Sequence, residues 1–110
     1  MNDDLMLELK EKVMLLDKAV TSFGKRGRAA AQADVEYRIG FAKKMLQLKA
    51  EGVAATLIPD LAKGSDEVAP LLLDRQIKES ERDSAKEAIN AYKLQIKVLE
   101  DQIEREWHSQ

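Results

Sequence analysis

The chain has no cysteine, a single histidine and very few residues that interrupt helices. Without cysteine there is no disulfide framework, thiolate zinc site or cysteine nucleophile. The 110 residues include only two prolines and five glycines, so the regular turn signals of an all-β protein are missing. No run of about 18 apolar residues is present, and the first residues lack the basic segment of a standard secretion signal. We therefore expect a cytoplasmic protein that does not span a membrane.

The residues that are present favour long helices. Hydrophobic residues make up 45% of the chain and charged residues 35%, but aromatic residues only 5%. This composition is typical of coiled coils and long helices. Two segments repeat apolar residues at alternating spacings of three and four, as helices that pack lengthwise do: Leu9, Val13, Leu16, Val20 and Phe23, and then Ile89, Tyr92, Ile96, Leu99 and Ile103. The predicted fold is all-α, a long antiparallel helical hairpin that resembles a coiled coil.

The helix boundaries follow from capping residues, within one predicted domain over residues 1–110. Asn2 is the expected N-cap of a first helix over about residues 3–51, which Gly52 would end. Gly24 and Gly27 leave open whether this helix is continuous, or is kinked or broken at 24–27 to give a third helix.

The connection over residues 53–65 is predicted to contain a short helical turn. Thr56 would cap this turn, and Pro59 would lie in its first turn, where a missing N–H costs nothing. Ser65 is the predicted cap of the last helix, over about residues 66–107. Pro70 fits that start poorly, so the helix either begins nearer Pro70 or bends there.

Folding the chain at the middle of the connection brings small residues of the two long helices opposite each other. This pairing would let the backbones approach closely at the middle of the hairpin. The small residues on the two sides are Ala29, Ala30, Ala31 and Ala33, and Ala85, Ala88 and Ala91.

Each long helix also carries a second apolar stripe that a two-helix hairpin cannot bury. The exposed stripes are predicted at Val35, Ile39 and Leu46, with Ala42 between them, and at Leu94 and Val98. Another protomer would cover them in a homo-oligomer, either a dimer or a larger assembly. Alternatively, a kinked N-terminal helix would fold back over them in a monomer.

The only strongly charged segment is basic. Between residues 25 and 49 the chain has seven lysines and arginines against two acidic residues. A nucleic-acid contact through this segment would use Lys25, Arg26, Arg28, Lys43 and Lys44. Against it, these cations spread around a helix, and no aromatic residues for base stacking are interleaved with them. A solvated helix surface is the other interpretation.

Nothing in the sequence predicts catalysis, a cofactor, a metal site or a small-molecule substrate. The carboxylates are scattered over helix surfaces without the enclosed polar site that shifts pKa values. Glu104 and His108 are spaced to face each other on a helix, but an exposed charged surface explains them better than a metal site. Trp107 is expected to close the core against Val13 or Met14, with a partner-docking role as the alternative.

Three stretches carry a resemblance to a known group of proteins. They are Ala50–Gly64 (AEGVAATLIPDLAKG), Glu87–Lys93 (EAINAYK) and Leu99–Trp107 (LEDQIEREW). Together they resemble small helical proteins encoded by temperate phages and prophages of Gram-positive bacteria, over roughly residues 30–107. Pro70 departs from that pattern. The resemblance implies a setting among early genes near replication and recombination functions, in a bacterial cytoplasm, and it carries no catalytic motif.

The hypothesis that follows is a non-catalytic accessory or adaptor protein. It would self-associate and bind a protein partner, in a DNA replication or recombination complex. One alternative is a nucleic-acid-binding module that uses residues 25–49. Another is an inhibitor of a host defence or nuclease protein, which sequence does not distinguish from the adaptor.

Overall fold

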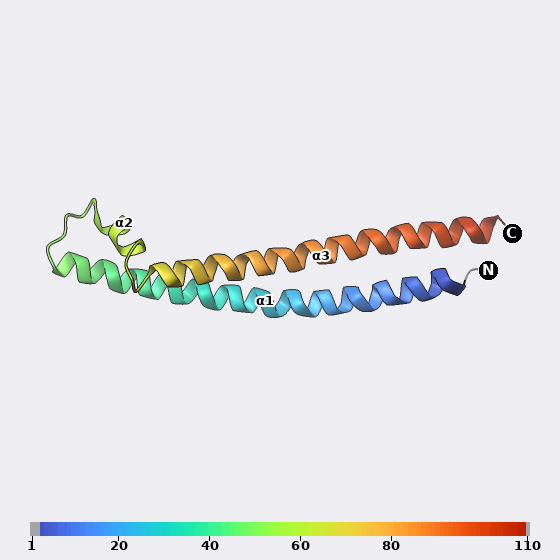
Figure 1. The fold of residues 1–110 in the computed structure, drawn as a ribbon, viewed down its shortest axis with the longest axis horizontal. Helices are drawn as coiled ribbons and strands as arrows, with labels where there is room; N and C mark the ends of the chain where they lie inside the picture. The colour runs from blue at the N-terminus through green and yellow to red at the C-terminus, as the bar shows by residue number, and fades with distance from the viewer. Residues whose placement is uncertain (1–2, 110) are drawn as a thin grey trace. The chain divides into compact units, whose positions relative to one another are not determined.

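The structure, a computed structural model, describes residues 3–109 and is helical as predicted. Helix α1 spans Asp3–Ala50, helix α2 spans Ile58–Lys63 and helix α3 spans Ala69–His108. Helix α3 runs antiparallel to α1, and no strand occurs within the described residues (Figure 1). The all-α hairpin is therefore confirmed. The expected cap at Asn2 lies outside the described residues, and Asp3 and Asp4 lie in the first turn of α1.

Helix α1 is continuous through Gly24 and Gly27, so the first helix is neither broken nor divided into two at these residues. Two interior glycines cost roughly 2 kcal/mol of helix propensity, which tertiary packing outweighs when one face of the helix is buried. Burial recurs on both sides of the glycines. Phe23 and Gly27 are half-buried, and Ala30 is buried.

By packing, the chain divides into two compact units. One comprises Met1–Lys25 and Asp83–Gln110, of which residues 3–25 and 83–109 are described; the other comprises Arg26–Arg82. Each unit contains a segment of α1 and a segment of α3. The second, Arg26–Arg82, also contains α2 and is called the connection unit below.

The end of α1 is fixed by a glycine, as predicted. Gly52 has a φ of +83°, a conformation that costs a residue with a Cβ atom about 1–2 kcal/mol. The Val53 N–H donates to the Leu48 carbonyl at 3.1 Å, and the Gly52 N–H donates to the Lys49 carbonyl at 3.1 Å. This pair of bonds is a Schellman motif, and Val53 and Leu48 supply the apolar contact that accompanies it.

Helix α2 packs against the last turns of α1. Its buried residues Ile58 and Ala62 form a cluster with Leu48, and Phe41, Met45 and Val53 pack against that cluster. Pro59 lies in the first turn of α2, as predicted, and Gly64 follows its end. Thr56 does not cap α2, because Leu57 occupies the N-cap position and makes no side-chain cap bond.

Helix α3 begins at Ala69, three residues after the predicted start at residue 66. A separate turn precedes it. Ser65 caps this turn as a helix N-cap does: its Oγ accepts a hydrogen bond from the Val68 N–H at 3.3 Å and donates one to the Ala62 carbonyl at 2.7 Å. The later start places Pro70 in the first turn of α3, where its missing N–H has no intrahelical partner to lose.

Two cations enclose a pair of stacked rings in the connection unit. The rings of Tyr37 and Phe41 stack with centroids 5.7 Å apart. The Arg75 guanidinium carbon lies 4.4 Å from the Tyr37 ring centroid, and Lys63 Nζ lies 5.9 Å from that of Phe41. Arg75 Nη1 also donates to Asp34 Oδ1 at 3.4 Å, and its Nε forms an ion pair with Glu79 Oε1 at 3.2 Å without the alignment of a hydrogen bond. These contacts join α1 to both α2 and α3.

Gly27→Ala and Gly40→Ala are expected to change stability differently, although both glycines lie inside α1. A Cβ atom at Gly27 meets nothing within 4 Å, so Gly27→Ala should raise the free energy of unfolding by about 0.5–1 kcal/mol. At Gly40 a Cβ atom would lie 2.5 Å from Leu71 Cδ1, so Gly40→Ala should lose this gain to overpacking. Urea denaturation of both variants measures the difference, and equal gains would contradict the close approach at Gly40.

Candidate partner-binding surfaces

The predicted stripe on α1 lies at the surface of the connection unit. Val35 is 49% exposed, Ile39 is 52% exposed and Leu46 is 69% exposed. Ala42, between them, is exposed as well. With 3.6 residues per turn, the four residues fall within about 60° of the helix surface. They form one continuous apolar strip, called the α1 stripe below, which no segment of the connection unit covers.

The predicted residues on α3 are also exposed. Leu94 is 66% exposed and Val98 is 53% exposed, in the unit that contains residues 3–25 and 83–109. They are one helical turn apart, so they lie on the same side of α3. Farther along this side the next residues are Asp101 and Arg105. The apolar area on α3 is therefore shorter than the α1 stripe.

The first half of α1 has an exposed apolar edge that includes two residues for which the sequence pattern predicts a place in the core. Val13 and Val20 are exposed, as is Met6. The residues that are buried or half-buried there recur at spacings of four and three: Leu5, Leu9, Lys12, Leu16, Ala19 and Phe23. The assignment of Val13 and Val20 to the seam is thus wrong, because Lys12 and Ala19 occupy the inward positions. Val13 and Val20 follow those positions by one residue, beside the seam.

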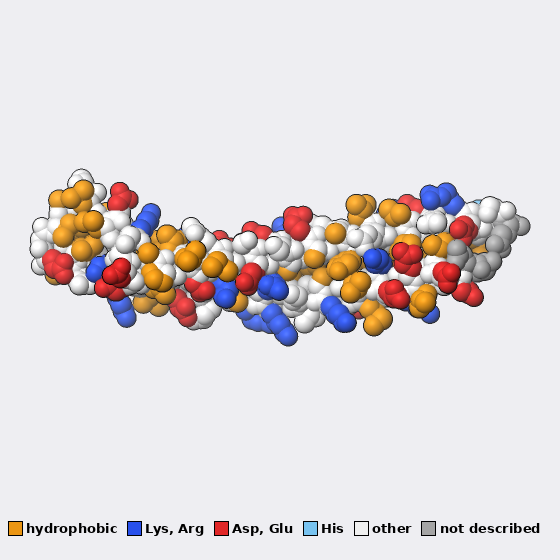
Figure 2. Space-filling model, viewed as in Figure 1, with side chains coloured by type: hydrophobic (Ala, Val, Ile, Leu, Met, Phe, Trp, Pro, Cys, Tyr) orange, Lys and Arg blue, Asp and Glu red, His pale blue; other side chains and the backbone are white. Residues whose placement is uncertain are grey.

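Two more pairs of exposed apolar residues lie in the connection unit. Leu57 and Leu61 are exposed at α2, and Leu73 and Ile77 are exposed on α3. Figure 2 shows hydrophobic side chains gathered on the surface over α2. Each pair is spaced by four residues, which is the signal that could have identified it in the sequence.

The candidate basic residues differ in what surrounds them. Arg26 forms an ion pair with Glu81 at 3.4 Å, and Lys44 forms one with Glu67 at 3.3 Å. The Lys44 side chain is only 14% exposed. Lys25, Arg28 and Lys43 are exposed. The carboxylates of α3 and of its preceding turn thus offset part of the positive charge that the sequence predicts for this segment.

Glu67, the partner of Lys44, has a pKa that differs from the ordinary value of a glutamate. A hydrogen bond from its own backbone and the nearby Lys44 ammonium hold the pKa of Glu67 below its usual value of 4.5. A carboxyl whose pKa is lower in the folded chain stabilises the fold at pH values above its unfolded pKa. That contribution disappears as the pH falls through the lower, folded pKa.

Glu67→Gln is therefore expected to lower stability by a constant amount above about pH 5, and by a shrinking amount below it. The reason is that acid protonates Glu67 and removes the same charge as the substitution. Urea denaturation between pH 3 and pH 7 measures the difference between the two proteins. Asp66→Asn, in the same turn, is the control for loss of an exposed carboxylate. A difference that grows in acid would contradict the assignment.

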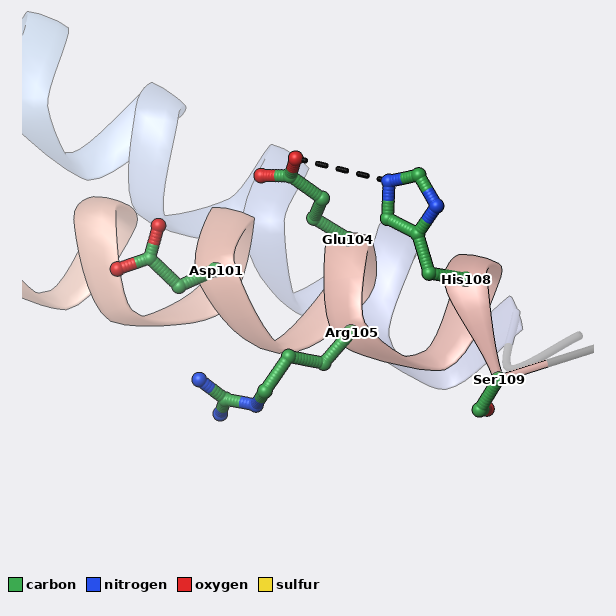
Figure 3. Close-up of a pocket in the computed structure, with 5 residues that line it drawn as sticks. All are labelled: Asp101, Glu104, Arg105, His108 and Ser109. Atoms are coloured by element: carbon green, nitrogen blue, oxygen red, sulfur yellow. Dashed lines mark ion pairs between the residues drawn. The ribbon is translucent and has the colours of Figure 1, made fainter.

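The charged end of α3 forms an open hollow and not an enclosed site. Figure 3 shows Asp101, Glu104, Arg105 and His108 on the last turns of α3, and Ser109 directly after the helix. His108 Nε2 lies 3.7 Å from Glu104 Oε1, and both side chains are largely exposed. Across residues 3–109, no three acidic or histidine side chains are grouped closely enough to hold a metal ion. A second shallow hollow is lined only by α1 residues, at Asp17, Lys18, Thr21, Ser22 and Lys25.

Trp107 does not close the core, contrary to the expectation from its position in the sequence. It is 63% exposed, and Val13 and Met14, its expected contacts, are exposed too. Leu99 is buried and Ile103 is half-buried, at the spacing of four that defines the inward side of α3. Trp107 continues that spacing but lies one residue beyond Glu106, the half-buried residue that ends the seam.

Comparisons with known proteins identify no relative. No protein-family model matches the chain, and neither a curated protein nor a solved structure matches it. No helix within the described part of the chain has the length and apolar content to cross a membrane.

Proposed function

We propose that the chain is a non-catalytic accessory or adaptor protein that self-associates and binds a protein partner. The setting that fits its sequence resemblance is the cytoplasm of a bacterium that carries a temperate phage, in a DNA replication or recombination complex. The observation that carries the proposal is the α1 stripe, with Val35, Ile39 and Leu46 each about half exposed or more. Contiguous exposed apolar surface of this kind is typical of protein-interaction sites.

Two separate apolar surfaces support a role that joins partners. The α1 stripe lies in the connection unit, whereas Leu94 and Val98 lie in the other unit. One surface can therefore bind a second copy while the other binds a different protein. The paired charges around Arg26 and Lys44 favour this function over a nucleic-acid contact, because Glu81 and Glu67 lower the positive potential that a phosphate would meet there.

Capture from a host lysate, with mass spectrometry, tests the adaptor role when it compares matched variants. The full chain should retain a specific protein that the double variant Leu94→Ser with Val98→Ser loses. Lys93→Ser with Lys86→Ser, which replaces exposed polar residues of the same helix, should retain it. Capture that is equal in all three would contradict a partner site at Leu94 and Val98.

A gel shift with single- and double-stranded DNA distinguishes the adaptor from the alternative, a nucleic-acid-binding module that uses residues 25–49. The adaptor proposal expects no shift. Binding that weakens steeply with salt, and that is lost when Lys25, Arg26 and Arg28 become alanine, would establish the nucleic-acid-binding module instead.

A further inference from the structure

We infer that the α1 stripe binds the α1 stripe of a second copy, with the two α1 helices antiparallel. The inference rests on the proposed function, because it names the occupant of one of its apolar surfaces. The residues Val35, Ile39, Ala42 and Leu46 are separated by four, three and four positions. This is the spacing of a seam between two helices.

The stripe is symmetric about its middle, between Ile39 and Ala42. A second copy that runs in the opposite direction therefore places its Leu46 against Val35 and its Ala42 against Ile39. Each layer combines a larger apolar residue with a smaller one, and the same residues serve both copies. Such a self-complementary contact is the isologous interface of a two-fold dimer.

The charges beside the stripe favour the antiparallel direction. Glu36 and Lys43 are seven residues apart, so they lie on the same flank of the stripe. In the antiparallel register Glu36 of each copy lies beside Lys43 of the other, which gives two ion pairs across the contact. A parallel register would instead place Arg38 of each copy beside Lys43 of the other and bring like charges together.

The contacts within the chain leave these charges accessible. Glu36 and Lys43 are exposed. Glu36 Oε1 accepts a hydrogen bond from Gln32 Nε2 at 3.1 Å, a contact on the surface of the same helix. Arg38, on the opposite flank, is paired with Asp34 at 2.9 Å. The stripe is four residues long, so the contact belongs with small, weak interfaces whose occupancy depends on concentration.

Charge reversal at the two flanking residues tests the register. Sedimentation equilibrium at low salt should show a concentration-dependent dimer for the unaltered chain. Glu36→Lys and Lys43→Glu should each weaken it about tenfold, because each turns two attractive pairs into two repulsive ones. An equimolar mixture of the two variants should recover the original affinity, since both cross pairs are then of opposite charge. Circular dichroism should show all these proteins equally helical.

The remaining outcomes separate this inference from the proposed function. If Lys43→Glu strengthens the dimer, the copies are parallel and the inference is wrong. A dimer that is insensitive to both reversals and to Ile39→Ser uses another surface, which overturns the inference but leaves self-association intact. A chain that is monomeric at every concentration overturns both.

Discussion

Leu48→Ala is expected to lower the free energy of unfolding by about 2–5 kcal/mol, the largest single effect expected for this protein. Leu48 is buried at the end of α1, where it packs with Ile58 and Ala62 of α2. Its carbonyl also accepts the Val53 N–H that ends the helix. Truncation of the side chain therefore removes the apolar contact that joins α2 to α1 and leaves a cavity beside it.

The control for this substitution is two residues away on the same helix. Leu46 is 69% exposed, so Leu46→Ala should change the free energy of unfolding by no more than about 0.5 kcal/mol in dilute protein. Urea denaturation followed by circular dichroism measures both variants. Similar losses would mean that α2 does not pack on Leu48 as described.

Ala30→Leu is expected to destabilise the fold by about 1–3 kcal/mol, although leucine forms helices nearly as well as alanine. Ala30 is only 2% exposed, and Ala33, one turn further on, is also buried. The larger side chain has no space at such a position, so it must displace neighbouring atoms. The thermal unfolding temperature and the urea midpoint should both fall.

Ala31→Leu separates this packing effect from any general effect of a larger side chain. Ala31 is exposed, next to Ala30 in the same turn. Its substitution should leave stability nearly unchanged. If Ala31→Leu destabilised the fold as much as Ala30→Leu, the burial of Ala30 would not be the cause.

The sequence predicts the helices well because their ends depend on local chemistry. Gly52 ends α1 through its own backbone conformation, and Ser65 caps the turn before α3 through hydrogen bonds within four residues. The later start of α3 follows from Pro70, the residue that fits the predicted start poorly. The sequence does not predict the continuity of α1 at Gly24 and Gly27, because continuity depends on burial along the whole helix, which helix propensity does not include.

The inward side of α1 was harder to predict because the most apolar residues are not always the ones that face α3. Val13 and Val20 are more apolar than Lys12 and Ala19, yet the latter are the half-buried residues. A lysine can occupy such a position by burying its aliphatic stem and keeping its ammonium in water. The sequence alone does not show that the two valines, or Leu57 and Leu61 at α2, are exposed. Their exposure depends on which side of each helix packs against the other helices.

The α1 stripe was predictable because its residues share one side of α1, whereas a different apolar stripe of the same helix packs in the core. Its exposure follows from geometry: α3 packs on one side of α1, and no segment of the connection unit lies over Val35, Ile39 or Leu46. The mixed environment of the basic residues was not predictable. The partners of Arg26 and Lys44 lie 55 and 23 positions away in the sequence, and only the hairpin brings them together.

The most direct test of the antiparallel contact is disulfide cross-linking between single-cysteine variants, because the chain has no cysteine of its own. Ile39→Cys and Ala42→Cys place one thiol each at adjoining positions of the proposed contact, within the reach of a disulfide. Under mild oxidation, a mixture of the two variants should form the mixed disulfide, one copy of each variant, much faster than either variant forms a disulfide with itself. Equal rates of self-linking, or no cross-linked dimer in the mixture, would contradict the antiparallel contact.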